Sequence, residues 1–158
     1  MHMHISGEPE IADNSATPCY GASVRRASRI LTRVYDEALA PSGLNLTQFS
    51  IAYLLSHHGP ATISDLAAWM DTDKTAMGRN LLPMERDRLI SIQTGEDRRS
   101  RQVALTSSGV ARYKKGVPLW QKAQKRVEKL LGKPQATALR SLLRQVAVKS
   151  CELVNKSA

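Results

Sequence analysis

The chain has 158 residues, a net charge of +9 and two cysteines. This length fits one domain, or one domain with an arm, that buries a core of its own. No apolar run approaches the 18 residues of a membrane-spanning helix and no signal peptide is recognised, so we expect a cytoplasmic protein without a membrane partner. Cys19 and Cys151 lie too far apart in sequence to form a metal or redox motif, which excludes a disulfide framework.

The positive charge is concentrated near the C-terminus. Residues 107–158 contain 12 basic and 2 acidic residues, whereas residues 62–106 contain 7 of each. A basic surplus is typical of proteins that bind polyanions such as nucleic acids, and it is equally typical of a solvated helix face. An argument for nucleic acid must therefore rest on where particular basic residues lie.

The N-terminal third predicts an arm and two helices. Residues 1–18 are polar and lack periodicity, so we expect a flexible arm. Apolar residues then recur at helical spacing over residues 19–39, and the sequence Ala-Pro-Ser-Gly at 40–43 stops that helix. A second helix follows over residues 48–57, and we expect Thr47 to be its N-cap.

Two further helices are separated by a short acidic turn. The first covers residues 62–70, where Thr62 and Asp65 have the spacing of a capping box. The second covers residues 74–89, and Asp73 is placed to cap it. One side of this second helix is apolar, whereas the other side is small or polar, as expected where a helix lies close to a polar partner: Lys74, Thr75, Ala76, Gly78 and Arg79.

A predicted β-hairpin follows these helices. Apolar and polar residues alternate over 90–93 and again over 101–105, around a turn that contains Gly95. A helix-turn-helix followed by a hairpin is a winged helix, so the expected fold is mainly α with a small β-hairpin wing. Winged helices place their second helix in the major groove of DNA.

Four runs of the sequence resemble the MarR family of bacterial transcription regulators: residues 44–55, 64–70, 74–90 and 96–109. The most specific part is Asp97-x-Arg99 on the wing, followed by Leu105-Thr106-x-x-Gly109. The resemblance extends from about residue 19 to the C-terminus. The chain departs from the family at Arg88, where relatives usually carry Gly, and at Gly78, where they usually carry a larger residue.

Two long helices close the chain, over residues 107–131 and 134–154, and Thr106 is the expected N-cap of the first. Their apolar seams exceed what a compact winged helix needs, so we expect a homodimer. The resemblance implies that the first helix and the last two helices form the dimer interface. The expected organisation is an arm at 1–18, a first dimerisation helix at 19–44, a winged helix-turn-helix DNA-binding region at 45–106, and C-terminal dimerisation helices at 107–158.

The expected partner is double-stranded DNA with a pseudo-palindromic operator, because two reading helices related by a twofold axis meet two half-sites. Thr75, Ala76 and Arg79 are candidates for base edges, and Lys74 for phosphate. On the wing, Arg99 is expected in the minor groove, with its guanidinium oriented by Asp97. Arg98 and Arg101 are expected to hold phosphates. The alternative for the wing is a salt-bridged surface turn. The alternative for the whole protein is a winged-helix interaction module without specific DNA binding.

The resemblance also implies regulation by a small aromatic or phenolic acid bound between the dimer core and the winged helix, and repression that the effector relieves. Arg25 or Arg29 would meet the carboxylate, and Tyr35 or Trp120 would stack on the ring. A competing hypothesis is redox sensing through Cys19, which lies near the start of the first helix.

An enzyme is not expected, because the sequence has no phosphate-cradling glycine loop, nucleophile elbow or metal-ligand cluster. Neither a cofactor nor a bound metal is expected. The operator sequence, the effector, the sign of regulation and the regulated pathway are not encoded in any readable pattern.

Overall fold

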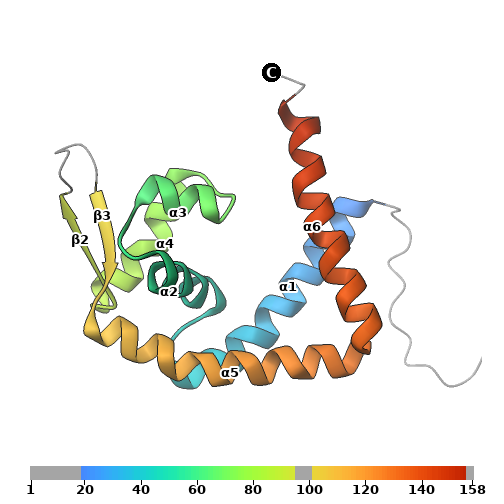
Figure 1. Ribbon diagram of the computed structural model, residues 1–158, viewed down its shortest axis with the longest axis horizontal. Coiled ribbons are helices and arrows are strands. Elements are labelled where there is room, and N and C mark those ends of the chain that lie inside the picture. Colours follow the sequence, from blue (N-terminus) through green and yellow to red (C-terminus); the bar gives the residue numbers. More distant parts are fainter. Residues whose placement is uncertain (1–18, 95–100, 156–158) are drawn as a thin grey trace, which may run out of the picture. The chain divides into compact units, whose positions relative to one another are not determined.

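The computed structural model describes residues 19–94 and 101–155 of the chain (Figure 1). The helices are α1 (Tyr20–Leu39), α2 (Leu46–His58), α3 (Ile63–Trp69), α4 (Lys74–Arg86), α5 (Ser107–Leu131) and α6 (Lys133–Asn155). The strands are β1 (Ala61–Thr62), β2 (Ile90–Thr94) and β3 (Arg101–Leu105), and a 3-10 turn, η1 (Ala40–Ser42), follows α1. The predicted fold, mainly helical with a hairpin wing, is confirmed. The chain divides into two units, residues 1–33 and 34–158.

The sheet has the order β1-β3-β2 and is antiparallel throughout. In the hairpin, Ile92 of β2 lies opposite Val103 of β3, and Ala61 of β1 lies on the other side of Val103. Val103 is fully buried as a result. The sequence analysis missed β1, because two residues are too few to show an alternating pattern.

The core of the second unit lies between the helices and the sheet. Its fully buried large side chains come from helices α1 to α4, from the turn after α4 and from β3: Leu39, Ile51, Leu66, Met77, Leu81, Met84, Leu89 and Val103. Full burial of each of these side chains contributes about 1.5–3 kcal/mol to folding stability. This cluster therefore holds α4 against the sheet. Among the described residues, no helix is long and apolar enough to cross a membrane.

Side-chain caps set the starts of four helices. Thr62 and Asp65 form a reciprocal capping box on α3, and Asp73 accepts from the amide of Ala76 at 2.8 Å on α4. Thr106 accepts from the amide of Gly109 at 3.0 Å on α5. All three caps were predicted. The prediction for α2 was wrong: its N-cap is Asn45, not Thr47, because Asn45 and Gln48 complete a capping box two residues earlier.

Helix α4 ends at Arg86, three residues before the predicted end. Arg88 then adopts a φ of 55°, in the left-handed region that favours glycine. The carbonyl of Arg88 accepts a 2.6 Å hydrogen bond from the Thr106 hydroxyl, and the amide of Thr106 donates to the carbonyl of Leu89 at 3.0 Å. The cap of α5 therefore also holds the turn that follows α4.

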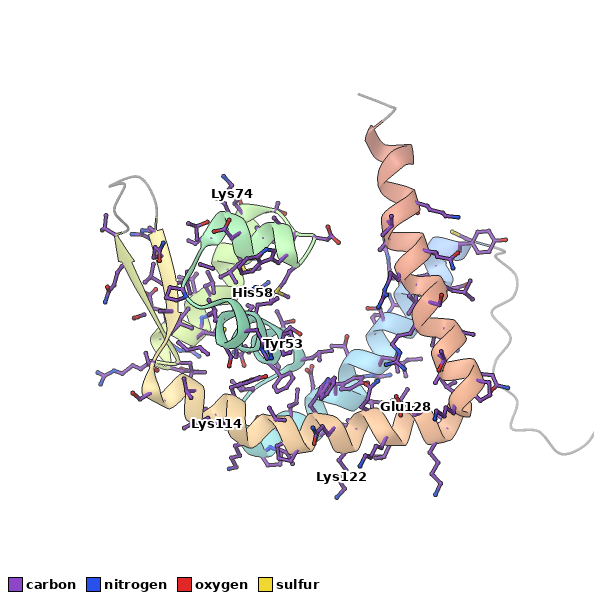
Figure 2. The ribbon with its side chains drawn as sticks, in the orientation of Figure 1. Tyr53, His58, Lys74, Lys114, Lys122 and Glu128 are labelled. Carbon is purple, nitrogen blue, oxygen red and sulfur yellow. The ribbon has the colours of Figure 1, made fainter. Side chains whose placement is uncertain are left out.

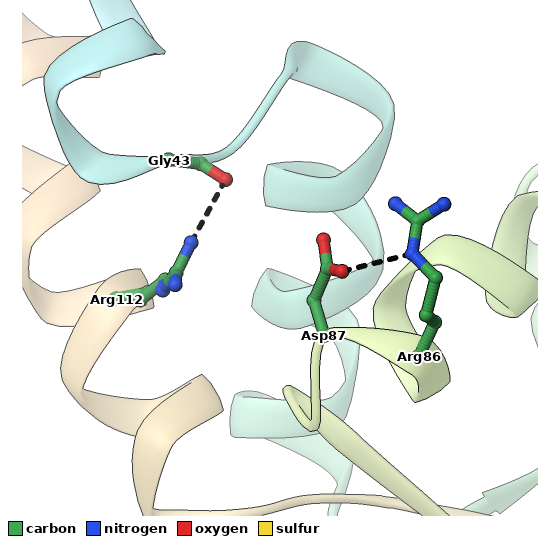
Figure 3. A network of polar contacts seen from close by, with 4 residues as sticks. All are labelled: Gly43, Arg86, Asp87 and Arg112. Atoms are coloured by element: carbon green, nitrogen blue, oxygen red, sulfur yellow. Dashed lines mark hydrogen bonds and ion pairs between the residues drawn. The ribbon is translucent and has the colours of Figure 1, made fainter.

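Helix α5 runs without interruption through Pro118. Gly116 is buried where α5 packs on α2, and a Cβ there would lie 3.0 Å from Phe49 Cδ2. Near the start of α5, the guanidinium of Arg112 donates to the carbonyl of Gly43 at 3.4 Å (Figure 3). These contacts attach α5 to the segment before α2.

Candidate nucleic-acid interface

Helix α4 presents a polar side to solvent. Met77, Leu81 and Met84 are buried on its core side. Thr75 and Arg79 are exposed and lie roughly opposite these residues around the helix. Lys74 is exposed at the helix N-terminus, and Figure 2 shows its side chain extending away from the rest of the winged helix. The buried anchors thus leave the first two turns of α4 free to meet a partner.

Two small residues lie within those turns. Ala76 is half-buried, and Gly78 has open space around the position of its absent Cβ. Gly78 is therefore not required by packing. It lowers the bulk of the helix surface at the point where a groove wall would approach.

The outer side of α4 also carries residues that the sequence analysis did not select. Leu82 is 62% exposed, which is unusual for a leucine, and Arg86 is exposed one turn further on. Thr75, Arg79, Leu82 and Arg86 follow steps of four, three and four residues, the spacing that places them on one helix face. The helical spacing of these four residues is visible in the sequence and could have identified this face. The Arg86 Nε lies 3.0 Å from a carboxylate oxygen of Asp87, and this hydrogen bond raises the pKa of the arginine (Figure 3).

On the wing, the structure places Arg101 at the start of β3, exposed and paired in register with Thr94. Asp97, Arg98 and Arg99 lie outside the described residues. Their predicted roles at the wing tip stay predictions.

A cavity of about 540 Å³ lies beside α2, between α3 and α5. Its walls are mostly aromatic: Phe49, Tyr53, His57, Trp69, Tyr113 and Trp120, together with Ser50, Leu54, Met70 and Val117. None of these lining side chains is a lysine, an arginine or a carboxylate. The cavity is therefore suited to a flat, largely apolar molecule.

The aromatic rings of the cavity are packed against each other. The Phe49 ring stacks on Trp120 with centroids 6.0 Å apart, and it meets Tyr113 at 5.4 Å. Burial raises the pKa of the Tyr113 hydroxyl, and the neighbouring Tyr53 adds to the rise. Tyr113 is thus a neutral hydrogen-bond donor at physiological pH. The signal for this site in the sequence was a set of spaced aromatic residues in three helices, which resembled ordinary core.

Of the predicted effector residues, only Trp120 lines this cavity. The hydroxyl of Tyr35 instead donates to Gln124 of α5, and burial, followed by the charge of Glu128, raises its pKa. A carboxylate oxygen of Glu128 in turn lies 3.7 Å from a guanidinium nitrogen of Arg140 in α6. Tyr35 therefore belongs to a polar network that joins α1, α5 and α6.

The remaining predicted residues lie on α1 or just before it. Arg25 and Arg29 are exposed on α1, in the first unit of the chain, and Cys19 is an exposed free thiol. Where the structure describes the chain, no group of three or more His, Cys, Asp or Glu side chains could hold a metal ion. The ring of His57 packs in a tilted arrangement against Tyr53, and the ring of His58 packs in the same way against Trp69.

Helix α6 carries an exposed apolar side. Its members lie within about 100° of one another around the helix, and they are 37% to 58% exposed: Leu139, Leu142, Leu143 and Val146. A contiguous apolar surface of this kind marks an interaction site on a protein of this size.

Comparison with known proteins connects these features. The model of the MarR family matches residues 44–100. The crystal structure of the transcriptional regulator MosR of M. tuberculosis, in complex with DNA, is 39% identical, with a TM-score of 0.73 over 84% of this chain and 98% of that one. The operator complex of a MarR mutant from E. coli is 22% identical, with a TM-score of 0.75 over 84% of this chain and 96% of that one, and supports the fold alone.

A curated relative is the uncharacterised HTH-type transcriptional regulator YwoH of Bacillus subtilis, 26% identical over 90 residues. The match covers 57% of this chain and 66% of YwoH, just under two thirds of that protein's length. The identity with MosR over nearly its whole length, the family match and the winged-helix fold agree with each other. The chain belongs to the MarR family of transcriptional regulators, and it is not an enzyme.

Proposed function

We propose that this regulator is a homodimer that binds a pseudo-palindromic operator, represses transcription there, and is released by a small aromatic effector. The observation that carries this proposal is the polar, exposed outer side of α4, held outward by three buried anchors. A relative of 39% identity, MosR, was crystallised with DNA, which supports the same kind of partner for this chain.

The residues of α4 divide into two roles. Arg79 has the length and the donors to meet a guanine edge, and Thr75 lies one turn before it on the same face. Leu82, 62% exposed, offers an apolar surface for a thymine methyl group, a role that we also assign to Ala76. Lys74 would hold a phosphate at the helix N-terminus, where free amides also favour an anion.

The wing would add contacts on either side of the reading helix. We assign Arg99 to the minor groove, oriented by Asp97, and Arg98 and Arg101 to phosphates. Arg101 is exposed at the start of β3, a position compatible with this role.

The dimer is supported by the apolar side of α6. Leu142 is 58% exposed and Val146 is 51% exposed, and a second copy of the same helix would cover them. A twofold axis would then place two α4 helices for half-sites that are about 34–36 Å apart.

The effector site that we propose is the aromatic cavity beside α2. Trp120 and Phe49 offer ring faces, and the Tyr113 hydroxyl offers a hydrogen-bond donor. Since no cationic side chain lines the cavity, a neutral aromatic or phenolic molecule fits it better than an aromatic carboxylate. Cysteine-based sensing through the exposed Cys19 is the competing mechanism.

The proposal is tested by selecting binding sites from a pool of random duplexes and measuring the mass of the free and DNA-bound protein. We expect an enriched sequence with twofold symmetry and a complex of two chains per duplex. Recovery of no common sequence would overturn the proposed function in favour of an interaction module.

A further inference from the structure

We propose that α5 carries a second DNA-binding surface, which contacts the sugar-phosphate backbone of duplex DNA outside the operator sequence read by α4. The surface is a basic stripe of Lys115, Lys122, Arg126 and Lys129. It goes beyond the proposed function, because it stands on other residues and would bind DNA without regard to sequence.

The basic stripe is a geometric feature of α5. Steps of seven, four and three residues place its four members within about 60° of each other around the helix. From the first to the last, it spans about 21 Å at 1.5 Å per residue. All four side chains are exposed, whereas Gly116 and Trp120 face the aromatic core.

The stripe lies on the side of α5 away from α2. Figure 2 shows Lys122 pointing away from the winged helix, while Lys74 of α4 extends in the opposite direction. A duplex on the stripe and a duplex on the reading helix would therefore touch different faces of the second unit.

No acidic side chain balances the stripe within the described part of the chain. The two ion pairs found there join Arg86 to Asp87 and Arg140 to Glu128. Glu128 is the only acidic residue in the sequence of α5, which contains seven basic ones. The stripe thus presents four positive charges to solvent without an anionic neighbour.

Such an arrangement opposes helix formation. Lys122 and Arg126 are four residues apart, and Arg126 and Lys129 are three apart, so like charges face each other across successive turns. A helix face that is merely solvated relieves this repulsion by alternating acidic and basic residues. A bound polyanion would relieve it instead.

Duplex DNA is the polyanion that fits best. It presents one negative charge per about 1.7 Å of its axis, so phosphates lie within reach of each of the four cationic side chains, and each contact would displace a counterion. Bound single strands need aromatic side chains on which bases stack, and the stripe has none. The winged-helix segment, residues 62–106, has as many acidic as basic residues, so long-range attraction to DNA must come from the C-terminal helices.

The test measures the affinity of the full chain for a duplex that lacks the operator, over a range of salt concentrations. In the stripe variant, Lys115, Lys122, Arg126 and Lys129 are all replaced by Gln. The matched control replaces four exposed basic residues of α5 and α6 outside the stripe by Gln: Lys114, Lys133, Arg144 and Lys149. Both variants lose the same net charge, and circular dichroism checks that both remain folded.

We expect the stripe variant to lower the slope of log affinity against log salt by about 3–4, since each lost phosphate contact accounts for about 0.9. The control should change the slope by less than about 1. Equal slopes for the two variants would overturn the proposal, because only total charge would then matter. Unchanged DNA binding with lost binding of polyglutamate would overturn it too, by identifying an acidic protein as the partner. The preference of the wild type for its operator is measured separately. A negative result for the stripe therefore does not contradict the proposed role of α4.

Discussion

Gly109 of α5 lies directly against the backbone carbonyl oxygen of Leu89, so closely that no Cβ could be accommodated at position 109. The neighbouring Thr106 caps α5 and donates a hydrogen bond to the carbonyl of Arg88. The motif Leu105-Thr106-x-x-Gly109 therefore attaches the start of α5 to the turn between α4 and β2.

Replacing Gly109 by Ala should destabilise the protein by about 2 kcal/mol or more, because the backbone of the turn must move to admit a methyl group. Urea denaturation measures the change. Gly78→Ala is the matched control, since Gly78 lies inside a helix with open space around it; it should raise stability by up to about 1 kcal/mol. Equal effects of the two substitutions on stability would contradict the close packing of Gly109 against the turn.

Arg88 lies in the turn to which this motif attaches α5. Its φ of 55° is unfavourable for a residue with a Cβ by about 1 kcal/mol, so Arg88→Gly should stabilise the protein by up to that amount. Arg86→Gly, at the end of α4, should instead destabilise it. Thermal unfolding of the two variants decides between these outcomes, and a lower melting temperature for Arg88→Gly would show that the conformation carries no strain.

Local signals in the sequence were sufficient to predict the helices and the hairpin. The caps at Thr62, Asp73 and Thr106 each depend on a side chain and an amide three residues apart, so a pattern of four residues identifies them. Asn45 competed with Thr47 for the same role, and only the pairing of Asn45 with Gln48 decides between the two. The pairing of β1 with β3 joins residues about 40 positions apart in sequence, and no local pattern encodes it.

The two candidate sites also differ in whether a local sequence pattern predicts them. The exposed residues of α4 follow from helical periodicity, because their buried counterparts define the opposite side. The aromatic cavity does not, since its walls come from three helices whose aromatic residues each look like core until the packing of the helices is known. That packing also places Tyr35 beside Gln124 and outside the cavity lining.

The capping box of α3 predicts a pH dependence. The carboxylate of Asp65 accepts hydrogen bonds from the hydroxyl of Thr62 at 2.7 Å and from its amide at 3.0 Å, and these bonds lower the pKa of Asp65. Because the folded pKa lies below the unfolded value of about 3.9, the stabilisation is complete above that pH and is lost as pH falls through the folded pKa.

Comparison of Thr62→Val with the wild type tests this dependence. The stability gap between them should be largest above about pH 5 and should shrink toward pH 3, because protonation of Asp65 removes its part of the box. Urea denaturation at each pH measures the gap. A gap that stays constant over this range would contradict the role of the carboxylate.

The cavity can be probed without labels, because both tryptophans of the chain, Trp69 and Trp120, line it. Titration with salicylate or a neutral phenol should quench the fluorescence in a saturable way. Val117→Phe would fill part of the cavity and should weaken binding at least about tenfold, a loss of about 1.4 kcal/mol. Leu130→Phe, at a residue that is 85% exposed and outside the cavity, should leave binding unchanged. Equal affinities for the two variants would place the ligand elsewhere.

The central claim is that the outer side of α4 reads DNA, and the most direct test is the affinity for a selected operator at two salt concentrations. Wild type is compared with Arg79→Ala on α4, with Arg99→Ala on the wing, and with Arg144→Ala, a control that removes one exposed positive charge from α6. We predict tight, salt-sensitive binding that falls by about 1–3 kcal/mol for Arg79→Ala, with relaxed sequence preference, and that is nearly unchanged for Arg144→Ala. Indistinguishable binding of wild type and Arg79→Ala, or of operator and random DNA, would contradict the claim.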